Sequence, residues 1–405
     1  MWSKAFLFLT LATAVLGEEI KRAVPQTIQL TSRMPKRRSL KSRQLPPTTI
    51  PLADFFLGTD LQWFGNISVG TPPQPVSVVF DTGSVTLEFT STLCGAACSN
   101  QIKFDPTKSR TFVDGGRTSS ITFSTGVGVD PVVGANYRLT LRSGRDVVSV
   151  GGLSAGTVDL SLVTDQTPKF AIDPFSGILG MGATAVNVFG GLVNQGLPCK
   201  IWFIARNVRL LIIVTALFSM FLTPNAVGEA ELTFGGIDNT RFQGPLTFAS
   251  LPSTSGRTWE LPSPQISVNG RTTTTLRQRR TVIFDSGTSN ILFSTATTEA
   301  IYALISPDIK PNPAEPGAYG IACNRINTLP AVIDIGFTAQ NGQPFNLTIP
   351  STELNVGPFA NDPTLCQTLI NAFDGLDLVG GSVLKHYYSV WDIGNRRMGF
   401  APNGL

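Results

Sequence analysis

Short apolar runs alternate with polar punctuation along this chain, and the pattern predicts a mostly β protein. The runs are rich in Val, Ile and Phe, and they end at Gly, Pro, Asn or Ser, which favour turns. The chain has 39 Gly and 28 Pro among 405 residues, an abundance that favours many short strands over long helices. A chain of this length exceeds one ordinary hydrophobic core, so we expect two lobes.

Two of the predicted strands end in the same way. Each is an apolar run followed by Asp, a hydroxyl residue, Gly and a second hydroxyl residue: Asp81-Thr82-Gly83-Ser84 after 78–80, and Asp285-Ser286-Gly287-Thr288 after 282–284. A strand that ends in Asp beside a Gly turn presents its carboxylate at a loop tip. One such tripeptide is often an ordinary turn, but two copies after matching runs indicate an internal duplication.

A second repeated element supports the duplication. Ile178-Leu179-Gly180 follows the first Asp at nearly the distance at which Leu378-Val379-Gly380 follows the second. The period is too long for a solenoid. We therefore expect two similar lobes, each giving one loop to a shared centre, where a carboxylate pair can activate a water molecule by acid–base catalysis.

Longer stretches around these loops resemble the pepsin-like aspartic proteases. The likeness runs from about Pro51 to Pro402, and within the family the chain most resembles the secreted fungal, polyporopepsin-like members. It includes these segments: 64–74, 104–106, 109–112, 173–182, 231–238, 387–392 and 397–401. The resemblance implies a bilobal fold of two related β-barrel-like lobes with an active-site cleft between them. It also implies a secreted aspartic endopeptidase that hydrolyses peptide bonds at acidic pH.

The same resemblance implies a role for each residue of the two loops. Asp81 and Asp285 form the catalytic dyad, which shares a proton and activates water without a covalent intermediate. Gly83 and Gly287 let backbone N–H groups approach the dyad. The hydroxyls of Thr82 and Ser286 join the two loops by hydrogen bonds. The hydroxyls of Ser84 and Thr288 form hydrogen bonds to the outer carboxylate oxygens. No metal and no other cofactor is expected.

The chain departs from the family pattern around the flap, the hairpin expected to cover the dyad. The expected flap and substrate-binding residues are Phe123, Ser124, Thr125 and Gly126, where the family usually has Tyr at the first position. The Trp that usually follows the first Asp by seven residues is Glu88. Because that Tyr and Trp normally hydrogen-bond to each other, we interpret the change as a paired loss that leaves no donor unpaired. A third departure, Ser176 in place of Asp, is expected to be minor.

The N-terminal region predicts targeting and processing segments. Lys4 precedes the apolar run 5–16, so residues 1–17 are a predicted signal peptide. Residues 18–43 carry eight Lys or Arg against two Glu. We expect a basic propeptide over 18–50, the alternative being a disordered arm that binds nucleic acid or a membrane. The mature chain is expected to begin between Ser39 and Pro51 and to form lobes over 51–234 and 235–405.

The five cysteines expose an anomaly. By resemblance to the family, Cys94 pairs with Cys98 and Cys323 with Cys366, which leaves Cys199 unpaired. Cys199 opens an unusual insertion over 199–215, which interrupts the expected helix-to-strand connection. It can be a soluble insertion, part of a transmembrane segment over 201–222, or, as we prefer, a retained intron that is absent from the mature protein. A transcript that still encodes 199–215 would contradict the preferred interpretation.

The remaining residues narrow the function. The single histidine, His386, is expected to be a satisfied or exposed strand residue, so a multi-histidine zinc site or a Ser-His-Asp arrangement has no support. Asn66 and Asn346 open glycosylation sequons. The expected partners are polypeptide substrates and the chain's own propeptide, with no nucleic acid and no stable membrane anchor. We expect a monomer that is secreted or, alternatively, vacuolar. A peptide-binding protein with impaired catalysis is the rival function.

Overall fold

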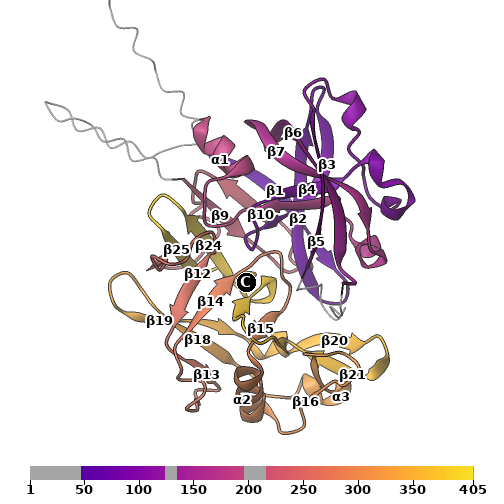
Figure 1. Cartoon of the computed structure of the whole chain (residues 1–405). Helices are drawn as coiled ribbons and strands as arrows, with labels where there is room; N and C mark the ends of the chain where they lie inside the picture. The colour runs from indigo at the N-terminus through magenta and orange to yellow at the C-terminus, as the bar shows by residue number, and fades with distance from the viewer. Residues whose placement is uncertain (1–46, 124–134, 196–215, 405) are drawn as a thin grey trace, which may run out of the picture. The chain divides into compact units, whose positions relative to one another are not determined.

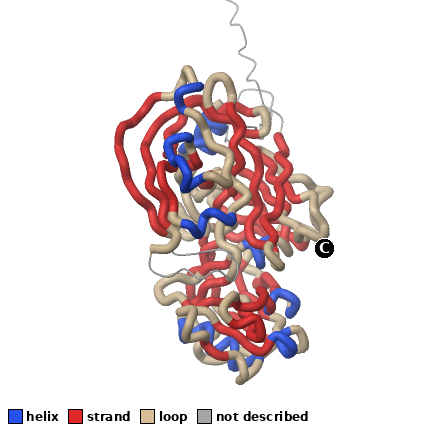
Figure 2. The backbone as a smooth tube through the Cα atoms, turned by 90° about the vertical axis from the view of Figure 1, so that its right-hand side faces the viewer, coloured by secondary structure: helices blue, strands red, loops and turns tan. Residues whose placement is uncertain are grey.

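The computed structural model describes residues 47–123, 135–195 and 216–404 (Figure 1). Several sequence predictions therefore lie outside the described residues. They are the signal peptide, the propeptide as far as residue 46, the flap residues Ser124, Thr125 and Gly126, and the insertion 199–215. Strands dominate both halves of the described chain, and the helices are short (Figure 2). The mostly β prediction is confirmed.

One large sheet joins strands from both ends of the chain. Its order is β11-β25-β24-β9-β10-β1-β2-β3-β8-β4-β7-β6-β5. The bounds are β1 (Thr48–Phe56), β2 (Asp60–Val69), β3 (Gln74–Asp81), β4 (Leu87–Thr90), β5 (Val113–Thr122), β6 (Arg138–Val150), β7 (Leu153–Gln166), β8 (Gly177–Gly180), β9 (Leu217–Phe221), β10 (Ala230–Phe234), β11 (Thr247–Ser250), β24 (Tyr387–Asp392) and β25 (Arg397–Pro402). The pairing of β9 with both β10 and β24 brings the two halves into one structure.

The second half of the chain adds three smaller sheets. The five-stranded sheet contains β12 (Glu260–Ser263), β14 (Arg280–Phe284), β23 (Leu378–Val379), β15 (Ile291–Phe293) and β22 (Ile370–Ala372). The others are β13 (Ile266–Val268) with β18 (Ile333–Thr338) and β19 (Pro344–Ile349), and β16 (Lys310–Pro311) with β17 (Tyr319–Ala322), β21 (Asp362–Thr368) and β20 (Asn355–Phe359).

Helices occupy the connections between strands. The α-helices are α1 (Asn187–Asn194), α2 (Thr295–Ile305), α3 (Cys323–Ile326) and α4 (Gly381–Leu384). The 3-10 helices are η1 (Thr92–Cys98), η2 (Pro106–Lys108), η3 (Pro168–Ile172) and η4 (Ser351–Leu354). No helix within the described ranges combines the length and apolar character needed to cross a membrane. The transmembrane alternative is wrong for its last part, because residues 217–221 form β9 inside the large sheet.

The repeated sequence elements form the same arrangement in both halves. In the first half β3 and β8 run parallel, and Asp81 lies opposite Gly180. In the second half β14 and β23 run parallel in the same way. Each Gly that ends the apolar-apolar-Gly element lies tightly against the chain that follows the Asp loop. A Cβ at Gly180 would lie 2.5 Å from Val85 N, and one at Gly380 would lie 2.2 Å from Thr288 O. The Gly is therefore a packing requirement, which explains why it recurs.

Aromatic side chains fill the core where the halves meet. The Phe218 ring stacks on Trp391 with centroids 5.7 Å apart, and Trp391 meets Trp259 edge to face at 5.3 Å. The Trp259 indole donates to Met181 O at 2.8 Å, so this buried ring also satisfies its polar atom. Burying one such side chain contributes roughly 1.5–3 kcal/mol. This shared core holds the two Asp loops in a fixed relation.

Candidate active site

The two Asp loops face each other across their glycines. The Gly83 amide donates to Asp81 Oδ1 at 2.8 Å, and the Gly287 amide donates to Asp285 Oδ1 at the same distance. A Cβ at Gly83 would lie 2.5 Å from Asp285 Cγ, and one at Gly287 would lie 2.4 Å from Asp81 Oδ1. Each glycine thus makes room for the carboxylate of the opposite loop, which no other residue would allow.

Crossed hydrogen bonds join the loops. The Thr82 amide donates to Ser286 Oγ at 3.0 Å, and the Ser286 amide donates to Thr82 Oγ1 at 2.9 Å. The two hydroxyls in turn donate across the interface, Thr82 to Phe284 O at 3.0 Å and Ser286 to Phe80 O at 2.6 Å. Both side chains are buried, so this satisfied network fixes the carboxylates in one geometry.

The two Asp loops differ in the hydroxyl residue that ends each of them, Ser84 in the first loop and Thr288 in the second. Thr288 Oγ1 donates to Asp285 Oδ2 at 2.7 Å, as the resemblance implies. The expectation for Ser84 is not met, because its buried Oγ has no hydrogen bond of acceptable geometry in the described part of the chain. The hydroxyl lies near enough to favour the ionised form of Asp81, but the effect is smaller than that of burial. Within the described residues, Asp285 thus accepts hydrogen bonds from the Gly287 amide and the Thr288 hydroxyl, whereas Asp81 accepts one from the Gly83 amide and lies near the Ser84 hydroxyl.

The electrostatics of the pair follow from this burial. Removal from water raises the pKa of Asp81 well above its usual range, and the nearby Asp285 carboxylate adds to the shift. Two carboxyl groups this close do not ionise independently. Burial and the neighbouring carboxyl group therefore favour the protonated form of Asp81.

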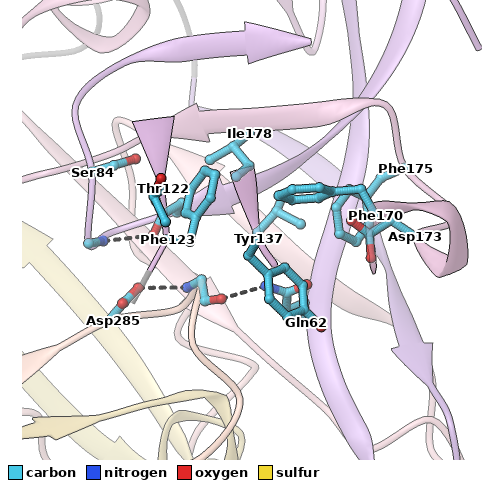
Figure 3. A pocket seen from close by; sticks show the side chains of 14 residues that line it. Gln62, Ser84, Thr122, Phe123, Tyr137, Phe170, Asp173, Phe175, Ile178 and Asp285 are labelled. Carbon is cyan, nitrogen blue, oxygen red and sulfur yellow. Dashed lines mark hydrogen bonds between the residues drawn. The ribbon is translucent and has the colours of Figure 1, made fainter. Parts of the chain in front are cut away.

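The pair opens into a cavity of about 260 Å³ (Figure 3). The lining residues are the dyad, Gly83, Ser84 and Gly287, together with Gln62, Val79, Thr122, Phe123, Tyr137, Phe170, Asp173, Phe175 and Ile178. Phe123 is the one predicted flap residue that the structure describes, and it does line this cavity. The Gln62 side chain donates to Gly287 O and so connects β2 to the second loop.

Sequence reasoning missed most of the cavity wall. Asp173, Phe175 and Ile178 lie within the quoted segment 173–182, so the motif carried a signal for them. Gln62 and Tyr137 carried none, because only the pairing of distant strands brings them to the dyad.

Glu88 lies in β4 and is buried, 2% exposed. Burial raises the pKa of Glu88 to about 7, opposed in part by a hydrogen bond with Thr86. It does not line the cavity. At acidic pH the position of the usual Trp is therefore held by a neutral carboxylic acid beside the Thr86 side chain, and the paired loss of Tyr and Trp stays an interpretation.

Disulfides join Cys94 to Cys98 in η1 and Cys323 in α3 to Cys366 in β21. The sequon residues Asn66 and Asn346 are exposed on β2 and β19, and their glycosylation stays a prediction. The prediction of a strand position for His386 is wrong. His386 lies in the turn before β24, where its Nε2 is 3.1 Å from Glu353 Oε1. Across the residues that are described, no group of three or more His, Cys, Asp or Glu side chains could hold a metal ion.

Comparison with known proteins adds independent findings. A sequence model of the family described as eukaryotic aspartyl protease matches residues 62–403. Pepsin-2B of Gadus morhua is 32% identical over 357 residues, covering 85% of this chain and 96% of the relative. Cathepsin D of Dictyostelium discoideum is 32% identical over 423 residues, covering 98% and 97%. Pepsin A of Rhinolophus ferrumequinum is 28% identical over 385 residues, covering 91% and 87%.

Proposed function

The chain belongs to the eukaryotic aspartyl protease family, and from this premise we propose that it is an endopeptidase that cleaves polypeptides at acidic pH with Asp81 and Asp285. The observation that carries the proposal is the buried pair of interacting carboxyl groups on the wall of a cavity that several aromatic side chains help to line. Such a pair supplies a proton donor and a proton acceptor side by side.

The geometry supports distinct roles for the two carboxyl groups. Asp81 holds the proton, since burial raises its pKa. Asp285 is the base, because hydrogen bonds from Gly287 and Thr288 suit a carboxylate. In the first step a water oxygen bonds to the scissile carbonyl carbon, Asp285 takes a proton from that water, and Asp81 gives its proton to the carbonyl oxygen.

The second step restores the dyad. Asp285 gives the proton it received to the amide nitrogen, the C–N bond breaks, and Asp81 recovers a proton from a hydroxyl of the tetrahedral intermediate. The crossed bonds between Thr82 and Ser286 hold both groups in place, so little reorganisation is needed. One retained proton is required throughout, and this requirement supports activity at acidic pH.

We extend the proposal to processing and location. A signal peptide over 1–17 and a basic propeptide over 18–50 precede lobes over 51–234 and 235–405, and the protein acts outside the cell or in an acidic vacuole. Residues Thr48, Thr49 and Ile50 pair with β10, which supports a cleavage N-terminal to Thr48 within the expected 39–51 window, so that the propeptide ends before residue 48 and these three residues stay with the first lobe. We also propose that the protein is a monomer of the secreted fungal, polyporopepsin-like branch.

The test is digestion of a denatured protein by the processed enzyme from pH 2 to 7, with and without pepstatin. Asp81→Asn should lower the activity by at least about a thousandfold, while the thermal unfolding midpoint stays close to that of wild type. Acid activity that survives Asp81→Asn would contradict the mechanism. A processed wild-type protein that binds peptides without cutting them would favour the rival binding function.

A further inference from the structure

Tyr137 lies at the catalytic cavity although it comes from outside every motif of the dyad and flap. It directly precedes β6, and its side chain is 3% exposed. It lines the same cavity as Asp81 and Asp285. Figure 3 shows its ring extending into the pocket. Of the described residues that line this cavity, it is the one phenol.

Strand pairing fixes Tyr137 opposite Phe123. The strands β5 and β6 are antiparallel, and their pairing ends with Thr122 opposite Arg138. The next backbone hydrogen bond runs from the Phe123 amide to Tyr137 O at 2.9 Å. Side chains directly opposite each other on an antiparallel pair lie on the same face. Phe123 and Tyr137 therefore approach the cavity together, one from each strand of the hairpin.

Phe170 in η3 supports both rings. The Tyr137 and Phe170 centroids are 5.4 Å apart with an interplanar angle of 82°, and the Phe123 and Phe170 centroids are 5.8 Å apart at 69°. Both are edge-to-face contacts within the usual range for aromatic pairs. The backbone adds a second constraint, because the Arg138 amide donates to Thr167 Oγ1 and the Thr167 amide to Arg138 O, each at 3.0 Å.

We propose that Tyr137 is a specificity-determining residue of this protease, whose ring limits the size of the substrate side chain accepted next to the cut bond. The inference rests on the proposed function, since it concerns the same cavity. Phe123 is half-buried and Tyr137 is buried, so Tyr137 is the more firmly held part of this wall. A ring that is packed on Phe170 cannot move aside without losing that contact, and so it sets a fixed boundary.

A neighbouring residue separates this role from simple packing. Tyr137 and Leu141 belong to the same apolar cluster as the Cys94–Cys98 disulfide and Phe170. Leu141 is 4% exposed but does not line the cavity. Truncation of Leu141 should therefore cost stability, as truncation of Tyr137 does, without enlarging the space beside the dyad.

The experiment measures kcat/KM of the processed enzyme on peptides that differ only in one residue flanking the cut bond, each flank being varied in turn through Leu, Phe and Trp. Tyr137→Ala should raise the Trp-to-Leu ratio about tenfold at the flank that occupies this cavity. Tyr137→Phe should keep the wild-type ratio, because it keeps the ring. Leu141→Ala should leave the ratio within about twofold of wild type.

Equal ratios in Tyr137→Ala and wild type, or equal shifts in Tyr137→Ala and Leu141→Ala, would overturn the inference. If Tyr137→Ala does not fold, Tyr137→Trp decides, because a larger ring should lower the same ratio and an unchanged ratio would contradict the proposal. Failure of the proposed function has a different signature, namely no cleavage by wild type or undiminished cleavage by Asp81→Asn.

Discussion

Two pairs of interacting carboxyl groups lie within the described part of the chain, and their surroundings differ. Asp81 and Asp285 meet at the catalytic cavity, where hydrogen bonds come from amides and hydroxyls and no basic residue is among the described lining residues. Asp54 in β1 and Asp60 at the start of β2 form the second pair, which lies beside a buried lysine. A coupled carboxyl pair alone therefore does not mark a catalytic site.

The second pair belongs to a buried ionic cluster. Lys385 Nζ lies 2.7 Å from Asp60 Oδ2 and 2.8 Å from Glu353 Oε2, and the lysine side chain is 5% exposed. Burial alone would raise the pKa of Asp60, but Asp54, the Asn225 amide and Lys385 together lower it. Burial would likewise raise the pKa of Glu353, but His386 and Lys385 lower it. The cluster keeps these two carboxylates ionised.

The proton of the second pair is held rather than used. Burial and the neighbouring Asp60 raise the pKa of Asp54 to about 8, so Asp54 is neutral over the acidic range. Both its carboxyl oxygens are shielded from solvent, and neither Asp54 nor Asp60 lines the catalytic cavity. The difference lies in access and in the nearby cation. Asp81 and Asp285 line a cavity, as their proposed exchange of protons with a substrate requires, whereas the second pair lies beside Lys385 at the junction between β2 and the turn before β24.

Removing the positive charge of Lys385 from the second pair should have the largest effect on the free energy of unfolding. Lys385→Met leaves Asp60 and Glu353 buried without their positive partner, so we expect the free energy of unfolding to fall by about 3–5 kcal/mol at pH 6. Urea denaturation of the processed enzyme measures it. Lys310→Met, at an exposed lysine, should change this free energy by less than about 0.5 kcal/mol. A loss below about 1 kcal/mol in Lys385→Met would show that the lysine does not compensate these carboxylates.

Replacing Asp54, the residue that holds this proton, should change how the free energy of unfolding depends on pH. The raised pKa means that folded Asp54 keeps a proton between pH 3.8 and about 8, whereas the unfolded chain has released it. The free energy of unfolding therefore falls as the pH rises through this window, by at most ~1.4 kcal/mol per pH unit from this group, and levels off above it. Asp54→Asn carries no titrating proton, so its stability should decline less steeply than that of wild type.

Urea denaturation at pH 4, 6 and 8 measures the two slopes. Asp159→Asn is the matched control, because the Asp159 side chain is 76% exposed, and its slope should equal that of wild type. Identical slopes for Asp54→Asn and wild type would contradict the assignment of a held proton to Asp54.

The two pairs also differ in how far the sequence reveals them. The dyad follows from a local pattern that occurs twice, and the fold follows from strand patterning and length. The Asp54–Lys385 cluster has no such signal, since it joins residues from opposite ends of the chain and Lys385 stands in an apolar context. The position of Tyr137 at the cavity could not be predicted for a similar reason, because only the pairing of β5 with β6 places it opposite Phe123. The missing Ser84 hydrogen bond is a matter of side-chain orientation, which a motif does not encode.

The smallest expected effect tests the asymmetry inside the dyad. Thr288→Val keeps the shape of the side chain but removes the donor to Asp285 Oδ2, so the carboxylate form loses support. The acid limb of the kcat/KM profile should move to higher pH by about half to one unit. Ser84→Ala is the matched control in the other loop, and since the Ser84 hydroxyl lies beside Asp81 and not beside Asp285, the acid limb of this variant should move by less than about a quarter of a unit. Equal shifts in both variants would mean that the two loops support their carboxylates alike, and the assignment of Asp285 as the base would then lose its structural reason.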